Sequence, residues 1–169
     1  MSSLFDLVKS KRSVREFADG PLPQDLVRQI LDSGRLAGSA KNMQPWHFVA
    51  IERKETLAAL AQCGQWASHL AGASLGIALV TADPFLRLSV PFDLGRAAQN
   101  MMLTAWAAGV GSEMATIYRP DRAREILGVP DGYNIPWCIS FGYPAHPESR
   151  PARKGGRRTA EEVFHVEKW

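Results

Sequence analysis

The sequence DLGRAAQNMMLTAWAAG, residues 93–109, predicts a helix that is apolar nearly all round. Its large apolar side chains, among them Met101, Leu103 and Trp106, face several directions rather than forming one stripe. Such a helix has to lie at the centre of the fold or against a partner molecule. Because the chain is short, a second copy is the simplest cover, and we expect a homodimer.

Shorter helices and strands surround this helix without a strict βαβ order. Segments 46–52 and 74–82 are short and almost wholly apolar, which predicts strands covered on both faces. This mixture favours an α+β fold over a doubly wound parallel sheet. The other expected strands are 112–118 and 135–142, and the other expected helices are 3–10, 23–37, 54–62, 65–72 and 120–127, the last capped by Gly128.

The composition is that of one soluble globular domain covering residues 1–169. Hydrophobic residues make up 46% and charged residues 22%, and neither a repeat nor a linker divides the chain. The net charge of +3 is too small to indicate a nucleic-acid binder. We expect no secretory signal and no transmembrane segment. The two cysteines, Cys63 and Cys138, form no CxxC motif, which favours a reducing cytoplasm.

A basic segment, KRSVREF at residues 11–17, follows the first expected helix. Lys11, Arg12, Ser13 and Arg15 combine three cations with a hydroxyl group, which is the mixture that binds a phosphate dianion. The alternative is a solvated helix end whose cations complement the helix dipole.

An amide loop, residues 39–44, precedes the strand that begins near Trp46. Amides in a buried position are unfavourable unless a partner bonds to them. Ser39, Asn42 and Gln44 could present donors and acceptors to a planar heterocycle. The alternative is a polar turn that leads into the strand.

The C-terminal region, residues 144–169, is expected to be an extended basic arm. Arg153, Lys154, Arg157 and Arg158 form its second group of cations. On its own this group predicts no more than a basic arm in solvent. Together with the basic segment and the amide loop, it supplies the parts that a mononucleotide cofactor requires.

The order of these motifs resembles the FMN-dependent nitroreductase-like flavoproteins. The basic segment matches that family's opening pattern, and Asn42 to Trp46 match its Asn-x-Gln-Pro-Trp loop. The segments 97–112, 127–145 and 157–165 are also similar, so the resemblance covers nearly the whole chain.

The resemblance implies an α+β fold with a central mixed or antiparallel sheet flanked by helices, in an intertwined homodimer. One FMN would lie at each of two sites across the interface. Lys11, Arg12 and Ser13 would hold its phosphate and ribityl end, with Arg157 or Arg158. Arg15 would approach the N1/C2 edge of the ring, Ser39, Asn42 and Gln44 its polar edge, and the backbone around Thr116 would face N5.

Three departures from the family pattern affect these expectations. Lys11 stands where arginine is more frequent, which removes a bidentate contact to phosphate. Ala40 replaces a frequent serine. Segment 110–130 is short compared with larger members, so we expect an open and poorly selective substrate pocket.

The expected reaction is hydride transfer from NADH or NADPH to flavin N5 and then, in a ping-pong mechanism, to an electron-poor acceptor such as a nitroaromatic compound or a quinone. It requires no protein nucleophile, no catalytic acid or base and no metal, and the four histidines lack metal-ligand spacing. Two alternatives remain: a non-catalytic protein that binds or handles flavin, and a basic protein that binds anions or nucleic acid.

Overall fold

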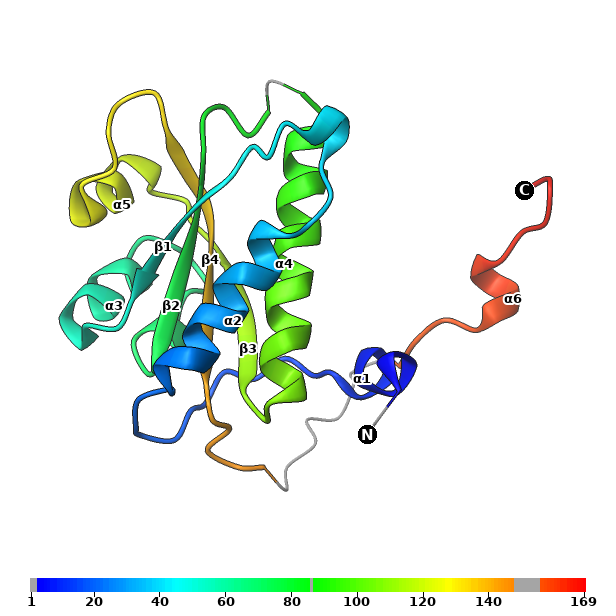
Figure 1. Ribbon diagram of the computed structural model, residues 1–169, viewed down its shortest axis with the longest axis horizontal. Coiled ribbons are helices and arrows are strands. Elements are labelled where there is room, and N and C mark those ends of the chain that lie inside the picture. Colours follow the sequence, from blue (N-terminus) through cyan, green and yellow to red (C-terminus); the bar gives the residue numbers. More distant parts are fainter. Residues whose placement is uncertain (1–2, 86, 148–155) are drawn as a thin grey trace.

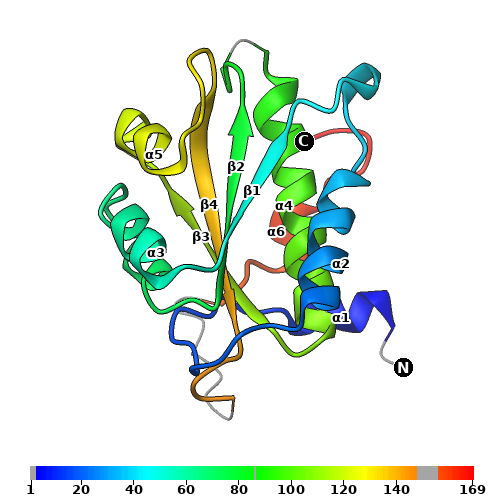
Figure 2. The same cartoon turned by 60° about the vertical axis from the view of Figure 1, so that its left-hand side comes forward.

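A computed structural model describes residues 3–85, 87–147 and 156–169. The described residues form three layers, with a sheet between two layers of helices (Figures 1 and 2). The strands are β1 (His47–Ile51), β2 (Leu75–Thr81), β3 (Gly111–Thr116) and β4 (Asn134–Gly142). The helices are α1 (Leu4–Ser10), α2 (Gln24–Arg35), α3 (Lys54–Ala61), α4 (Ser89–Ala107), α5 (Pro120–Leu127) and α6 (Ala160–Val163), with short 3-10 turns η1 (Ala40–Asn42) and η2 (Ser68–Leu70).

The strand order is β1-β2-β4-β3, and each neighbouring pair is antiparallel. β2 is buried along its whole length, as predicted from its uninterrupted apolar sequence. The prediction that the first strand is covered on both faces was wrong. β1 lies at an edge of the sheet, where the flanking helices do not cover it fully, and His47 and Ala50 are exposed.

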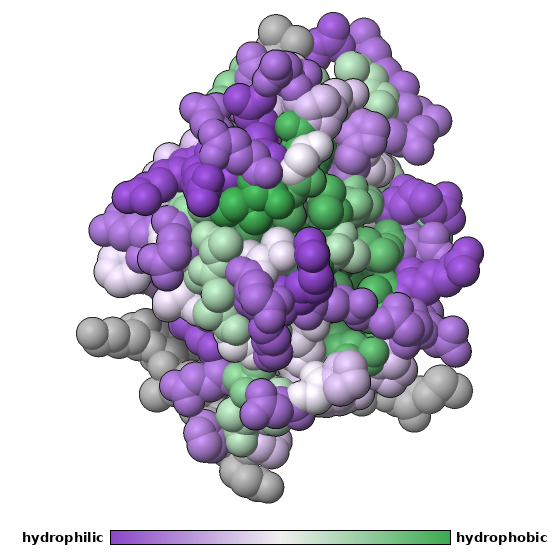
Figure 3. Space-filling model, turned by 90° about the vertical axis from the view of Figure 1, so that its left-hand side faces the viewer, coloured by the Kyte–Doolittle hydropathy of each residue, from purple (hydrophilic) through white to green (hydrophobic). Residues whose placement is uncertain are grey.

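Helices α2 and α4 cover one face of the sheet, while α3, η2 and α5 cover the other. Ile30 of α2 and Met101 of α4 are fully buried in one core cluster between this helical layer and the sheet. Gly34 permits the close approach of α2 and α4, because a Cβ at this position would overlap the Met101 side chain. The opposite face shows apolar surface surrounded by polar side chains (Figure 3), and Val49 and Ile126 are partly buried against its core.

Helix α4 begins at Ser89, four residues before the predicted start. Pro91 falls in its first turn, where a missing N–H group costs nothing. Phe92 in this turn is 69% exposed, and Phe85 and Leu88 just before it are exposed as well. The N-terminal end of α4 therefore presents apolar surface that the described residues do not cover.

The prediction of a helix over 65–72 was wrong, because only the single turn η2 forms there. The carbonyl of Cys63 accepts hydrogen bonds from the N–H groups of Tyr118 and Arg119. Gly64 lies so close to the Thr116 carbonyl that a Cβ would overlap it. This docking onto the chain after β3 replaces a continuous helix.

Residues 156–169 of the C-terminal arm stand away from the layered body (Figure 1) and are exposed throughout. Pro144 and Ala145, at the start of the arm, instead pair with Phe17 and Glu16. The arm is not wholly extended, since α6 forms one turn with a capping box between Thr159 and Glu162. Phe164 is 73% exposed and Trp169 is fully exposed. Large apolar side chains on an arm of this kind indicate a surface that another molecule covers.

Candidate functional site

The basic segment lies along the outer edge of β3 as a short extra strand. Val14 N–H donates to the Ser112 carbonyl over 3.1 Å, and Ser13 forms a parallel bridge with Ser112. Further along, Ala18 N–H donates to the Tyr143 carbonyl over 2.8 Å. Backbone pairing with the sheet therefore sets the position of the cations, although Lys11 also caps the end of α1.

Two paired glycines let this segment approach the edge of the sheet closely. Gly111 and Gly142 are cross-strand partners on β3 and β4. A Cβ on Gly111 would lie 2.6 Å from Cβ of Val14, and one on Gly142 would lie 2.8 Å from the Phe17 ring. Both distances are shorter than atoms tolerate, so these positions require glycine.

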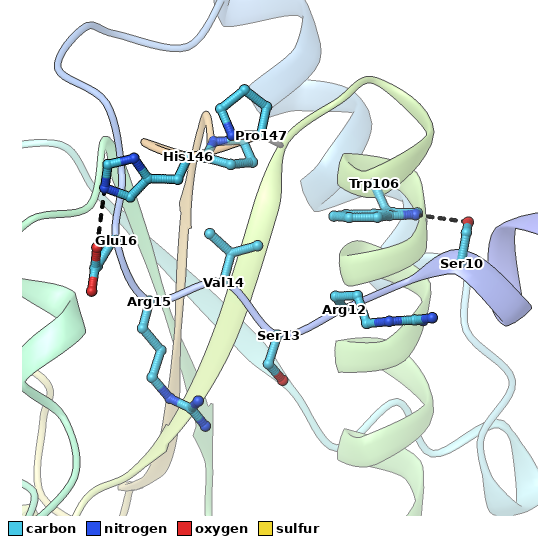
Figure 4. Close-up of a pocket in the computed structure, with 10 residues that line it drawn as sticks. Ser10, Arg12, Ser13, Val14, Arg15, Glu16, Trp106, His146 and Pro147 are labelled. Carbon is cyan, nitrogen blue, oxygen red and sulfur yellow. Dashed lines mark hydrogen bonds and ion pairs between the residues drawn. The ribbon is translucent and has the colours of Figure 1, made fainter. Parts of the chain in front are cut away.

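A pocket of about 490 Å³ opens beside the basic segment (Figure 4). Of the predicted site residues, Arg12, Ser13 and Arg15 line it. In the close-up, Ser13 and Arg15 point to one side of the segment and Val14 to the other. Trp106 closes one end, where its Nε1 donates to Ser10 Oγ over 3.1 Å.

The charges at the pocket have defined partners. Arg12 Nη1 donates to the carbonyls of Lys9 and Lys11 over 2.9 and 2.8 Å. Arg15 Nη2 lies 3.2 Å from Glu113 Oε1 on β3. Burial lowers the pKa of Lys11 below its usual 10.5, and the negative charge of Glu113 acts in the opposite direction. Three cations thus lie near the carboxylate of Glu113, and a second carboxylate, Glu16, lines the pocket and lies 3.5 Å from His146 Nε2.

The outer edge of β3 continues beyond the basic segment. Ile117 N–H donates to the Pro136 carbonyl, so by the antiparallel register Glu113 and Ala115 also pair inward with β4. The backbone groups of Met114 and Thr116 then face outward. Thr116 lies at this edge, where Gly64 packs against its carbonyl, and it does not line the pocket. Its place opposite flavin N5 stays a prediction.

The amide loop lies at the other end of α4. Ala40 N–H donates to the buried Asp93 Oδ2 over 2.9 Å, and Gln44 N–H donates to Ser39 Oγ over 2.9 Å. Asn42 and Gln44 are exposed, so their amide groups do not need a bound partner to offset the cost of burial. Gln44 lines a second pocket of about 410 Å³ with Trp46 and Phe48.

The backbone of the amide loop is strained. Lys41, Asn42 and Gln44 have φ values of 52°, 55° and 47°, in the left-handed region. A residue before proline favours an extended backbone, but Gln44, which precedes Pro45, does not adopt one. The hydrogen bond to Ser39, together with the 2.8 Å bond from Trp46 N–H to the Gln44 carbonyl, holds a tight turn instead.

One chain does not bring the predicted site together. Asp93 beside the amide loop and Trp106 beside the basic segment are about 20 Å apart along α4, at 1.5 Å per residue. Figure 1 shows the loop in cyan at the upper end of this helix and the basic segment in blue at the lower end. Ser39, Asn42 and Gln44 are thus remote from Lys11, Arg12, Ser13 and Arg15.

The arm cations have no defined place in the site. Arg157 and Arg158 are exposed, and no hydrogen bond or ion pair among the described residues joins them to the basic segment. Arg153 and Lys154 lie outside the described residues. Sequence reasoning also missed Trp106, which lines the pocket, and Glu113, which pairs with Arg15, since both lie about a hundred residues away in the chain.

The described residues offer neither a metal centre nor a membrane-spanning helix. Residues 3–85, 87–147 and 156–169 contain no group of three or more histidine, cysteine, aspartate or glutamate side chains placed to hold a metal ion. None of the helices in these ranges combines the length and the apolar character that crossing a membrane requires.

Comparison with known proteins identifies the family. The sequence profile of the Nitroreductase family matches residues 8–75 and 66–143. A protein of Archaeoglobus fulgidus, provisionally named NADH dehydrogenase/NAD(P)H nitroreductase, is 30% identical across 100% of both chains. The chain therefore belongs to the nitroreductase family, and it is an oxidoreductase, as predicted.

Solved structures agree in fold. That of an FMN-dependent nitroreductase from Clostridium difficile superposes with a TM-score of 0.87 at 25% identity, over 98% of this chain and 100% of that one. Nitroreductase A from Vibrio parahaemolyticus gives a TM-score of 0.86 at 24% identity, over 100% of this chain and 77% of that one. The predicted nitroreductase-like α+β fold is confirmed.

Proposed function

We propose that the chain is an FMN-dependent oxidoreductase that moves hydride from NADH or NADPH to an electron-poor small molecule. The observation that carries this proposal is the placement of Arg12, Ser13 and Arg15 on the outer edge of β3, next to outward-facing backbone N–H groups. Such an arrangement offers charge-assisted contacts to a phosphate and neutral donors to a flat, polar ring.

The donor set fits FMN. Lys11, Arg12 and Ser13 would hold the phosphate and ribityl end, and Arg15 would stand at the N1/C2 edge of the ring. The Ser112 hydroxyl, beside the Ser13 bridge, is buried and has no hydrogen-bond partner among the described residues. When bound, the flavin supplies hydride acceptance and donation at N5. The cation of Arg15 would stabilise the negative charge that reduction places at the other edge of the ring.

A second copy of the chain would complete the site. Because about 20 Å of helix separates the two predicted halves, Ser39, Asn42 and Gln44 would come from the second subunit. The exposed apolar side chains at the start of α4 and on the arm support such an assembly. Arg157 or Arg158 would then reach the phosphate as part of an intertwined homodimer.

The acceptor would react in the same place as the nicotinamide donor, one after the other. No protein acid, base or nucleophile is assigned, because hydride transfer through the flavin requires none. Nitroaromatic compounds and quinones are the classes that suit an exposed flavin with a cationic edge. We therefore expect a small-molecule acceptor and ping-pong kinetics.

The visible spectrum of the purified protein tests this proposal. We expect the two absorption bands of oxidised flavin, released as FMN on denaturation, and their loss on adding NADH or NADPH without oxygen. A colourless protein that takes up no FMN would contradict the proposal and favour a basic anion binder. A coloured protein that neither nicotinamide reduces would favour a protein that only handles flavin.

A pair of arginine variants tests the location. Arg12→Ala should weaken FMN binding about tenfold, because a charge-assisted hydrogen bond is lost. Arg122→Ala is the matched control, since Arg122 lies on the exposed face of α5 and pairs with Glu125. Equal FMN affinity in the two variants would place the phosphate elsewhere.

A further inference from the structure

Glu113 on β3 is the carboxylate that meets the basic segment. Its Oε1 lies 3.2 Å from Arg15 Nη2, and its side chain is only 14% exposed, against 65% for Arg15. Its second oxygen, Oε2, is buried and has no hydrogen-bond partner among the described residues. The Arg15 side chain is therefore mostly exposed, and it pairs with a mostly buried carboxylate.

Buried groups hold the backbone of Glu113 from the inner side of the sheet. Ser140, its cross-strand partner on β4, donates from Oγ to the Glu113 carbonyl over 3.3 Å. His69 of η2 lies with Nδ1 2.7 Å from the same Oγ. The imidazole tautomer decides which of the two groups donates in that contact. The line His69, Ser140, Glu113 thus runs from η2 across two strands to Arg15.

The charge on Glu113 acts at short range. Lys11 and Arg15 from the basic segment face it, and His69 faces it from η2. Charges that are shielded from water interact more strongly than charges at the surface. A buried carboxylate next to Arg15 therefore both fixes the guanidinium and offsets part of its positive charge.

We propose that Glu113 is a positioning residue that holds Arg15 at the flavin and sets how strongly this cation favours the reduced cofactor. The inference rests on the proposed function, because it places FMN at Arg15. Removing the negative charge while keeping the hydrogen-bond acceptor should leave Arg15 in place with its charge uncompensated. The reduced, anionic flavin would then be more stable.

The test compares Glu113→Gln with Glu125→Gln, whose exposed carboxylate also pairs with an arginine. In the FMN-loaded protein, Glu113→Gln should shift the ratio of reduced to oxidised flavin about tenfold toward the reduced form, a potential rise of about 30 mV for two electrons. Glu125→Gln should leave the potential unchanged. In an Arg15→Gln background, the effect of Glu113→Gln should fall below half, because the residue that it acts through is gone.

The remaining outcomes overturn the inference in distinguishable ways. An unchanged potential in Glu113→Gln, or the same shift with and without Arg15, would overturn the positioning role while leaving the proposed function intact. Wild-type protein that binds no FMN would overturn both. In the apoprotein, the urea midpoint shifts of Arg15→Gln and Glu113→Gln should be less than additive in the double variant, and additive shifts would show that the pair does not form.

Discussion

The two ends of helix α4 carry the two halves of the proposed cofactor site, and they are built differently. At the C-terminal end, backbone pairing with β3 and close contact with two glycines fix the basic segment. At the N-terminal end, one buried carboxylate, Asp93, fixes the amide loop. The first half is part of the sheet, whereas the second is a strained turn held by a side chain.

This difference shows where each half is vulnerable. The basic segment should resist the loss of any one side-chain contact but not a change in the shape of the sheet edge. The amide loop should instead be sensitive to the loss of one side chain, Asp93, and less sensitive to the shape of the sheet edge. Since neither half reaches the other within one chain, the proposed shared site requires assembly, and loss of assembly is the strongest effect to test.

Removing the arm should have the largest effect. A chain that ends at Gly156 loses the exposed Phe164 and Trp169 together with Arg157 and Arg158. We expect it to elute as a monomer in gel filtration and to retain no FMN, because each half of the site would lose its complement. A dimer with stoichiometric FMN would contradict the shared site.

The control for this truncation keeps the arm and changes its charge. Arg157→Gln combined with Arg158→Gln should leave the dimer intact and weaken FMN binding about tenfold. Unchanged affinity would limit the arm to assembly.

Gly111→Ala should break the sheet edge beneath the basic segment. The added methyl group would lie against Val14, so the segment has to move away from β3. We expect the free energy of unfolding to fall by about 1–3 kcal/mol, with at least a tenfold loss of FMN affinity. Urea unfolding and flavin titration measure the two effects.

Gly72→Ala is the matched control for this change. No atom lies within 4 Å of the added methyl group, and the residue is exposed. Its free energy of unfolding should change by no more than about 0.5 kcal/mol. Equal losses in the two variants would remove the special role of the paired glycines.

Asp93→Ala should loosen the amide loop with a smaller effect on stability. Ala40 N–H loses its acceptor and Arg96, 3.8 Å from Asp93, loses its charge partner. We expect a loss of about 1 kcal/mol in the free energy of unfolding and weaker FMN binding in the dimer. Glu125→Ala, which removes an exposed ion pair with Arg122, should cost less than about 0.5 kcal/mol and leave FMN binding intact.

The pH dependence should be the smallest effect and should belong to the basic-segment end. Burial lowers the pKa of His69 below its usual 6.5, with Glu113 opposing and Arg15 reinforcing this shift. Between pH 7 and pH 5 the unfolded chain therefore takes up a proton that folded His69 resists, so stability falls as the pH falls.

His69→Asn measures this contribution. Asparagine can still donate to Ser140 but does not titrate, so the urea midpoint should change less between pH 7 and pH 5 than in the wild type. The same pH slope in both proteins would assign the dependence to other groups.

Much of the fold could be predicted because its signals are local. Pro120 and Gly128 mark the two ends of α5, and Gly128 adopts a φ of 63° as a left-handed cap requires. The apolar run of β2 is too short for a buried helix, so it predicts a buried strand. The position of β1 at an edge could not be predicted, since strand order depends on pairings between distant segments.

The candidate site divides in the same way. The cations of the basic segment are visible in the sequence because residue type alone indicates an anion. Their pairing with β3, the contact of Arg15 with Glu113 and the left-handed Gln44 depend on register and on tertiary hydrogen bonds. No pattern of neighbouring residues encodes these features.

The central place of β4 also bears on how the protein is made. β4 pairs with β2 and β3 on its two sides, yet it is the last of the four described strands to leave the ribosome. Until residue 142 has emerged, the apolar β2 lacks one neighbour and β3 lacks its inner one. Such late, long-range closure slows folding and leaves strand edges open to aggregation. The nascent chain should therefore depend on chaperones until its final third has been translated.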